Sequence, residues 1–229
     1  MDTVVLNEAE SRRYLSGNGI PMNRFLFVAK REQLYQAAQT LRFPLVMKLV
    51  SPKAVHKSDV GGVVLHITGT EELLEGWDRI FRQAGEHGIR SEDVEGVTVQ
   101  EELTGTEILV GLKRDATFGP VLVVGSGGVL VELVRDAVVG ICPLTEKDVD
   151  DMLSGIRSYR LLEGYRGMPA GDIPALRRML MEVSRMAMSR DDWEEIDLNP
   201  DIVGKSGEGA FAVDARVVCR APAVSAAGE

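Results

Sequence analysis

The residues of this 229-residue chain that are best suited to chemistry lie together in the segment 48–63, KLVSPKAVHKSDVGGV. The segment places three lysines beside a single carboxylate and ends in a pair of glycines. Adjacent glycines let the backbone approach a ligand closely, and consecutive N–H groups in such a turn can bind an anion. The pattern therefore indicates a phosphate-binding loop, although a simple hairpin turn also explains the glycine pair. The residues concerned are Lys48, Lys53, Lys57, Asp59, Gly61 and Gly62.

A histidine, His56, lies inside the same segment, next to Lys57. Imidazole has an ordinary pKa of about 6.5, so its neutral form is a competent nucleophile toward a phosphoryl group near neutral pH. The residue types alone allow two roles for this side chain. It either accepts a phosphoryl group or is a solvated loop residue.

Oxygen-bearing side chains recur near the C-terminal end of the chain. Asp197 and Asn199 are two residues apart in IDLNP, so on a strand they point to the same face, and Asp214 lies in AVDARV. Carboxylate and amide oxygens suit Mg²⁺, which keeps several waters and bridges to nucleotide phosphates. Two interpretations remain open: a Mg²⁺ site, or a turn at Asn199 together with an ion pair between Asp214 and Arg216.

Other polar residues in the middle of the chain have less definite roles. Glu101 and Glu102 end a strand in VQEEL, where backbone groups and a carboxylate could meet a nucleotide base and ribose, or be solvated. Glu107 alternates with Leu109, and the pattern does not decide which face either side chain takes. The glycine-rich run GSGG at 125–128 is a second candidate anion turn or a tight hairpin.

Helices and strands must position these groups. Capping residues and helical periodicity predict helices at 7–15 and 31–41 and others that start at Thr70, Thr145 and Asp172. Runs of β-branched residues predict strands at 45–50, 63–67, 97–100, 106–112, 121–125, 129–133, 194–200 and 210–217. The final helix carries an apolar stripe typical of core packing: Leu176, Met179, Leu180, Val183 and Met186. The middle strands favour an antiparallel sheet, and 221–229 is expected to be a loose tail.

Composition limits the possible functions. A formal net charge of −9 argues against coating nucleic acid, which usually requires a basic face. Cys142 and Cys219 lack the spacing of a disulfide framework or a zinc site. No apolar run has membrane-spanning length, and the first residues contain no signal-peptide core. We therefore expect a globular cytoplasmic protein that binds neither nucleic acid nor membranes, with a small anionic ligand.

Four motifs occur in a specific order: HKSDVGGV at 56–63, FGP at 118–120, LLEGYRG at 161–167 and IDLNP at 196–200. With this arrangement the chain resembles the ATP-grasp subunit of the NDP-forming acyl-CoA synthetases, the group that includes ADP-forming acetyl-CoA synthetase. Succinyl-CoA synthetase is a more distant relative. The similarity extends from about Asn7 to Val217.

The resemblance implies an α+β chain with the ATP-grasp fold, in which two lobes clasp a nucleotide. It implies an N-terminal helix within 1–20 that packs on the C-terminal lobe. The N-terminal lobe is expected at 21–98, the C-terminal lobe at 99–217 and a flexible tail at 218–229.

Position by position, the resemblance also implies a set of site residues. The phosphates are expected to meet Lys48, Lys57 and the loop residues Gly61, Gly62 and Val63. The adenine-facing linker is expected at Gln100, Glu101 and Leu103, with Glu107 beyond it. The Mg²⁺ ligands are expected to be Asn199 and Asp214, with Asp197 beside them. Asp201 departs from the pattern, because relatives usually carry an apolar residue after Asn-Pro.

In this family, acyl-CoA and phosphate yield an acyl phosphate, and a histidine on the CoA-binding part relays the phosphoryl group toward ADP. A second histidine, in the HKSDVGGV loop, is thought to share the relay, and His56 matches it. Because the chain has no recognisable CoA-binding domain, we expect a separate α subunit carrying the relay histidine, in a hetero-oligomer that uses ATP/ADP and Mg²⁺. Two alternatives remain: an ATP-grasp carboxylate–amine ligase without a nucleophilic histidine, and a non-catalytic nucleotide-sensing subunit.

Overall fold

The computed structural model describes residues 3–54, 57–128 and 136–220. His56, the strand expected at 129–133 and the tail expected from 221 lie outside the described residues. The chain divides into two compact units. The small unit comprises residues 7–9 and 23–104, and the large unit comprises residues 1–6, 10–22 and 105–229. The lobe boundaries expected after residues 20, 98 and 217 stay predictions.

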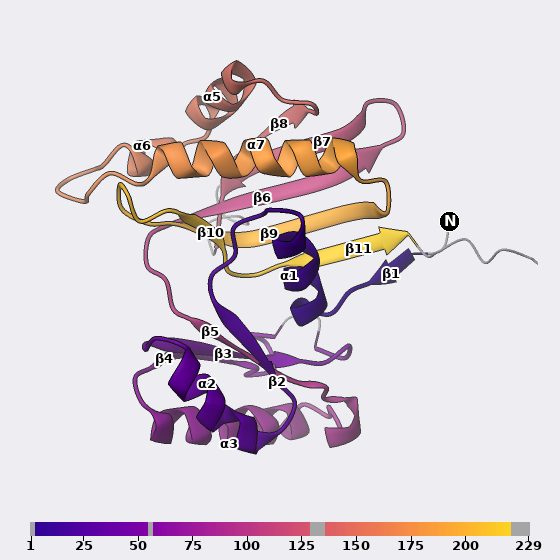
Figure 1. The fold of residues 1–229 in the computed structure, drawn as a ribbon, viewed down its shortest axis with the longest axis vertical. Helices are drawn as coiled ribbons and strands as arrows, with labels where there is room; N and C mark the ends of the chain where they lie inside the picture. Colours follow the sequence, from indigo (N-terminus) through magenta and orange to yellow (C-terminus); the bar gives the residue numbers. More distant parts are fainter. Residues whose placement is uncertain (1–2, 55–56, 129–135, 221–229) are drawn as a thin grey trace, which may run out of the picture. The chain divides into compact units, whose positions relative to one another are not determined.

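The small unit is built on a four-stranded antiparallel sheet with the order β2-β5-β3-β4. Two helices lie on one face of this sheet (Figure 1). The strands are β2 (Phe25–Val28), β3 (Leu45–Val50), β4 (Val63–Ile67) and β5 (Gly96–Glu101). The helices are α2 (Leu34–Thr40) and α3 (Thr70–Glu86), and the 3-10 turns are η1 (Arg31–Gln33) and η2 (Ser91–Asp93).

The two sheet faces of the small unit differ in character because alternate strand residues point to opposite sides. Leu45, Met47 and Leu49 of β3 join the helices in the hydrophobic core of this unit. Lys48, between two of them, therefore lies on the other face. Thr98 of β5, between the core residues Val97 and Val99, lies on this opposite face as well.

Two helix starts in the small unit differ from the sequence prediction. The helix expected at 31–41 begins as the 3-10 turn η1, and regular α-helix starts only at Leu34. Thr70 is the first helical residue of α3, and Gly69 takes the capping position without a side-chain hydrogen bond. A threonine inside the first turn was thus mistaken for the cap.

The large unit contains a seven-stranded antiparallel sheet with the order β1-β11-β9-β6-β7-β8, and β10 pairs with β9 off this path. Helices α5 and α7 cover one face (Figure 1). The strands are β1 (Thr3–Val5), β6 (Thr106–Asp115), β7 (Gly119–Ser126), β8 (Ala137–Ile141), β9 (Trp193–Val203), β10 (Ala210–Ala212) and β11 (Arg216–Arg220). The helices are α1 (Glu8–Gly17), α5 (Glu146–Gly155), α6 (Tyr159–Leu162) and α7 (Ile173–Ser189). The first two residues of α1, Glu8 and Ala9, belong to the small unit.

The two predicted helix starts in the large unit are confirmed by their caps. The Thr145 side chain accepts the backbone N–H of Asp148, and the Asp148 carboxylate accepts the N–H of Thr145 in return. Asp172 accepts the N–H of Ala175 at 3.0 Å. The apolar stripe predicted on α7 is buried in the core of this unit.

The strand predicted at 210–217 is wrong, because the structure divides it into β10 and β11. Both strands pair with β9, but with different parts of it: β10 with Asp201–Val203 and β11 with Trp193–Asp197. The chain must bend between them, and Asp214 lies in that bend. Its carboxylate accepts the N–H of the following residue, Ala215, at 3.0 Å, a local bond that competes with strand pairing.

Among the described helices, none combines the length and the apolar character needed to span a membrane.

Candidate functional site

Two lysines of the small unit converge on one carboxylate. Lys48 lies on β3, paired with Val63 on one side and Thr98 on the other, and is only 7% exposed. Its Nζ lies 3.8 Å from Oε1 of Glu8, and the Nζ of Lys57 lies 2.5 Å from Oε2 of the same residue. The structure thus brings together the two cations that the sequence predicts at a phosphate.

The glycine pair shapes the end of the loop that joins β3 to β4 and carries Lys57. Gly62 donates its N–H to the carbonyl of Lys57 and accepts the N–H of Leu49, both at 2.7 Å. A Cβ at Gly62 would lie 2.9 Å from the Lys57 carbonyl oxygen, and Gly61 has a positive φ of 63°. The close approach predicted for these glycines therefore exists, but in this structure it is to the protein's own backbone. The loop is held tightly against β3.

The predicted adenine-facing segment lies at the end of β5 and just beyond it. Gln100 is buried on β5, and Leu103 follows the strand, half-buried. The carboxylate of Glu101 accepts hydrogen bonds from the Arg24 side chain at 3.2 Å and from the Arg42 N–H at 3.1 Å. This carboxylate therefore fixes the strand end.

The predicted metal ligands lie in the large unit, around the middle of β9. Asp197 is exposed on the strand, Asn199 is half-buried two residues later, and Asp214 lies in the bend before β11. Partial removal from water raises the pKa of Asp197, and the negative charges of Asp214 and Glu195 raise it further against the opposing effect of Arg216. The site is therefore electronegative. The ion pair of Arg216 goes to Glu195, at 2.8 Å, which does not support the pairing with Asp214 that the sequence left open.

A glycine turn after β7 orients two of the predicted site residues. Gly128 donates its N–H to Oδ1 of Asn199, and Gly127 donates to the backbone carbonyl of Glu107, both at 3.0 Å. A Cβ at Gly128 would overlap the Glu107 carboxylate, 1.6 Å from its Oε2. Glu107 is exposed, on the face of β6 away from the core. The run at 125–128 thus places Glu107 and Asn199 beside the same turn.

The donor chemistry of this region fits Mg²⁺. Within the part of the chain that the structure describes, no three His, Cys, Asp or Glu side chains are grouped to hold a metal. Mg²⁺ needs only one or two carboxylates from a protein when nucleotide phosphates and water complete its shell. Asp197, Asp214 and the Asn199 amide offer oxygen ligands of this kind. Burial and then the charge of Asp214 raise the pKa of Asp197, and a nearby cation would offset the charge repulsion.

Asp201, the residue that departs from the family pattern, is buried on β9, opposite Ile108 of β6 and Ala212 of β10. It is 0% exposed, and neither carboxylate oxygen has a hydrogen-bond partner among the described residues. Burial, and then the charge of Asp197, raise its pKa well above the ordinary value. Burial therefore favours the neutral form of Asp201, and its carboxylate is not arranged as a metal ligand.

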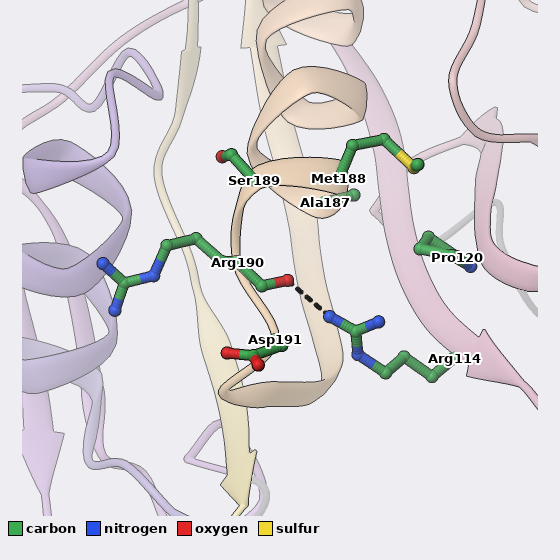
Figure 2. Close-up of a pocket in the computed structure, with 7 residues that line it drawn as sticks. All are labelled: Arg114, Pro120, Ala187, Met188, Ser189, Arg190 and Asp191. Atoms are coloured by element: carbon green, nitrogen blue, oxygen red, sulfur yellow. Dashed lines mark hydrogen bonds between the residues drawn. The ribbon is translucent and has the colours of Figure 1, made fainter.

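A cavity of about 380 Å³ opens elsewhere in the large unit, lined by Arg114, Pro120 and residues 187–191 (Figure 2). The Arg114 guanidinium donates to the carbonyls of Arg190, as Figure 2 shows, and of Trp193. It also stacks over the Trp193 ring at 4.3 Å. None of the predicted site residues lines this cavity, and its main cation serves to anchor the backbone.

Sequence reasoning missed two residues that organise the site. Glu8 looked like an ordinary acid in the first turn of a helix, where the helix dipole favours negative charge. Gly128 was noted only as part of a candidate anion turn or hairpin. For Glu8 the available signal was the chemistry of its partners, since a buried lysine on a strand requires an anion nearby.

These features define a class of protein. The chain belongs to the ATP-grasp domain family, whose model matches residues 2–219.

Within that family, the chain is similar to named enzymes from archaea. It is 35% identical over 215 residues to the acetate–CoA ligase [ADP-forming] II subunit beta of Pyrococcus furiosus, covering 93% of this chain and 91% of that one. It is 32% identical over 213 residues to the 4-hydroxybutyrate–CoA ligase [ADP-forming] of Nitrosopumilus maritimus. There the match covers 93% of this chain but only 30% of the relative.

Solved structures show the same similarity. The dinucleotide-forming acetyl-coenzyme A synthetase 1 of Ca. Korarchaeum cryptofilum, in complex with coenzyme A, Ca-AMPCP and HgCl⁺, matches with a TM-score of 0.86 and 36% identity. The match covers 94% of this chain and 93% of that one. A second structure of that enzyme, with coenzyme A and Mg-AMPPCP, has a TM-score of 0.81, 34% identity and the same coverage. Its phosphohistidine segment points towards the nucleotide-binding site.

Proposed function

We propose that this chain is the ATP-grasp subunit of an ADP-forming acyl-CoA synthetase. The enzyme would interconvert acid, ATP and CoA with acyl-CoA, ADP and phosphate. The observation that carries the proposal is the convergence of Lys48 and Lys57, two sequestered cations beside a tight glycine loop. It occurs in a chain that matches beta subunits over more than nine-tenths of its length.

In this proposal the small unit binds the nucleotide phosphates through Lys48, Lys57 and the backbone of Gly61 to Val63. The segment from Gln100 to Leu103 faces the adenine, with Glu107 beyond it. The converging ammonium groups support the first assignment, because phosphoryl transfer requires positioned positive charge around the moving group.

The large unit would supply Asn199 and Asp214 to Mg²⁺, with Asp197 beside them. When bound, the ion neutralises charge that develops on the phosphate oxygens. The hydrogen bond from Gly128 leaves the Asn199 oxygen a second lone pair for a cation. The complex of the Korarchaeum enzyme with Mg-AMPPCP supports the choice of ion.

The transfer step is assigned to His56 on sequence grounds. A ring nitrogen of His56 attacks the γ-phosphorus of ATP, the bond from that phosphorus to the bridging oxygen breaks, and ADP leaves. The reverse step returns the phosphoryl group to ADP. The Nζ of Lys57, the next residue in the chain, lies 2.5 Å from Oε2 of Glu8.

The rest of the reaction requires a partner. We propose a separate CoA-binding α subunit that carries the relay histidine, in a cytoplasmic hetero-oligomer. The Pyrococcus relative is itself a beta subunit, which supports a separate α chain. In the Nitrosopumilus relative the matched region is under a third of one longer chain, which is consistent with fused partner domains.

The test is to incubate the chain with γ-labelled ATP and Mg²⁺, with and without an α subunit from such an enzyme and acyl phosphate. We expect acid-labile label on the wild-type chain and on His87→Asn, a surface control on the C-terminal cap of α3. We expect none on His56→Asn. Unchanged turnover by His56→Asn, with nucleotide binding intact, would instead rule out the His56 relay and favour a ligase that needs no nucleophilic histidine. No label under any condition would indicate a nucleotide sensor.

A further inference from the structure

We propose that Glu8 is a positioning residue for nucleotide binding. Its carboxylate holds the ammonium groups of Lys48 and Lys57 at one point, so that both can reach the phosphates of one nucleotide. The inference rests on the proposed function, because it concerns the same lysines, and it assigns a role to a residue outside the predicted site.

The buried carboxylate of Glu8 forms ion pairs with two ammonium groups. Its side chain is 2% exposed, while those of Lys48 and Lys57 are 9% and 20% exposed. Oε2 lies 2.5 Å from the Lys57 Nζ, and Oε1 lies 3.8 Å from the Lys48 Nζ. Oε1 also accepts the hydroxyl of Thr98 at 3.3 Å. Three separate segments thus meet at one carboxylate.

The two lysines need such an anchor because their backbones differ in constraint. Lys48 lies on β3 and is fixed by strand pairing on both sides. Lys57 lies in the turn that leads to Gly62. Each side chain has up to about 2 kcal/mol of rotamer entropy to lose on ordering. Ion pairing with a buried carboxylate offsets that ordering cost before the nucleotide arrives.

The charges of Glu8, Lys48 and Lys57 indicate that Glu8 positions the lysines and does not compete with a phosphate for them. One carboxylate against two ammonium groups leaves a net charge of about +1, so the cluster still attracts a phosphate. An ammonium carries three N–H donors, so a lysine that donates to Glu8 can also donate to a phosphate oxygen. Without the carboxylate, two buried like charges would repel each other and move apart. If Glu8 instead competed with the nucleotide phosphates for the lysines, its removal would strengthen nucleotide binding.

The experiment compares Glu8→Gln and Glu8→Asp with the wild type in calorimetric titrations with Mg-ATP, Mg-ADP and adenosine. The matched control is Glu75→Gln, which removes the same charge from an exposed position on α3. We expect Glu8→Gln to weaken ATP and ADP binding by on the order of tenfold, the size of one charged hydrogen bond. Adenosine affinity should not change, Glu8→Asp should retain part of the phosphate affinity, and Glu75→Gln should match the wild type.

The outcomes separate the two proposals. If the wild type binds neither ATP nor ADP, the proposed function fails. If the wild type binds both and Glu8→Gln binds them equally or more tightly, the positioning role is overturned. An equal loss for ATP and adenosine also overturns it, because a merely structural residue would act on both ligands.

A folding defect in Glu8→Gln would appear in its melting curve. In that case the nucleotide affinities of Glu8→Asp test the positioning role. The shorter side chain keeps the charge but withdraws it by one methylene from the lysines. We expect a several-fold loss of ATP affinity that is absent for adenosine. In a Lys57→Met background, Glu8→Asp should lower the ATP affinity less than it does in the wild type, because both substitutions remove the contact between Glu8 and Lys57. Wild-type ATP affinity in Glu8→Asp contradicts the proposal.

Discussion

At the scale of single residues, the environment of each ionisable group decides what it can do. Glu8 and Asp201 are both buried acids, but Glu8 faces two ammonium groups, whereas Asp201 has no hydrogen-bond partner within the described residues. A buried carboxylate without a partner favours its neutral form. Glu8 is therefore an ion-pair partner, whereas burial favours the neutral form of Asp201, and the two acids lead to different predictions.

Asp201 should make stability decrease as pH rises. Its pKa is raised in the folded state by burial, and then by Asp197. The folded protein therefore holds the proton above the unfolded pKa of about 3.9, and stability is lost as pH rises toward the folded pKa. We expect Asp201→Asn to be more stable than the wild type at pH 8, with a gain that shrinks at pH 4, measured by urea unfolding. The gain is about 1.4 kcal/mol for each unit by which the pKa is raised.

The control for this series is Asp191→Asn, an exposed acid of the same unit, which should not alter the pH dependence. If Asp201→Asn lowers stability equally at pH 4 and pH 8, the neutral-acid account of Asp201 is wrong.

Lys48 should dominate phosphate affinity in the small unit. Its buried ammonium is fixed by β3, so replacing it removes a preorganised charge. We expect Lys48→Ala to weaken Mg-ATP binding at least tenfold by calorimetry, as expected for a charge-assisted bond. Lys53→Ala, an exposed lysine of the same segment, should bind within about twofold of the wild type. Equal affinities for the two variants would show that Lys48 does not contact phosphate.

At the scale of elements, caps and pairing partners decide where helices and strands begin and end. The capping roles of Thr145 and Asp172 could be predicted from the sequence, because a capping side chain acts on a backbone N–H three residues away. The division between β10 and β11 could not be predicted, since it depends on which part of β9 each segment pairs with. The apolar face of α7 followed from its periodicity. The role of Glu8 could not be predicted from the local sequence, because Lys48 and Lys57 lie 40 or more residues further along the chain.

Asp172 should be a strong local determinant of stability because it joins two segments. One oxygen caps α7 through Ala175, and the other accepts the N–H groups of Gly207 and Gly209, both at 3.0 Å. Burial acts to raise its pKa, but these hydrogen bonds outweigh burial, and the pKa is lowered. We expect Asp172→Ala to lower the free energy of unfolding at pH 7 by about 2 kcal/mol.

The sign of the pH effect follows from the lowered pKa of Asp172. Its stabilisation is present above the unfolded pKa and is lost as pH falls through the folded pKa. The difference from the wild type in urea unfolding should therefore shrink at strongly acidic pH. Thr145→Ala, which removes one cap bond from α5, should cost only about 1 kcal/mol at pH 7. A smaller loss for Asp172→Ala than for Thr145→Ala contradicts this account.

At the scale of the whole molecule, each unit has its own sheet and its own hydrophobic core. The sequence motifs predicted the ATP-grasp class because they span the chain in a specific order, and the family match confirms that class. The site could be predicted only as a set of residues. Which groups hold one another, such as Glu8 with the lysines or Gly128 with Asn199, depends on contacts that no local pattern encodes.

The proposed function requires that this chain exchange a phosphoryl group between ATP and His56. The most direct measurement is isotope exchange: labelled ADP, unlabelled ATP and Mg²⁺ are incubated with the purified chain and its α subunit, without acid or CoA. We predict that label moves from ADP into ATP with the wild type and with His87→Asn, and that no label moves with His56→Asn. Undiminished exchange by His56→Asn would contradict the account.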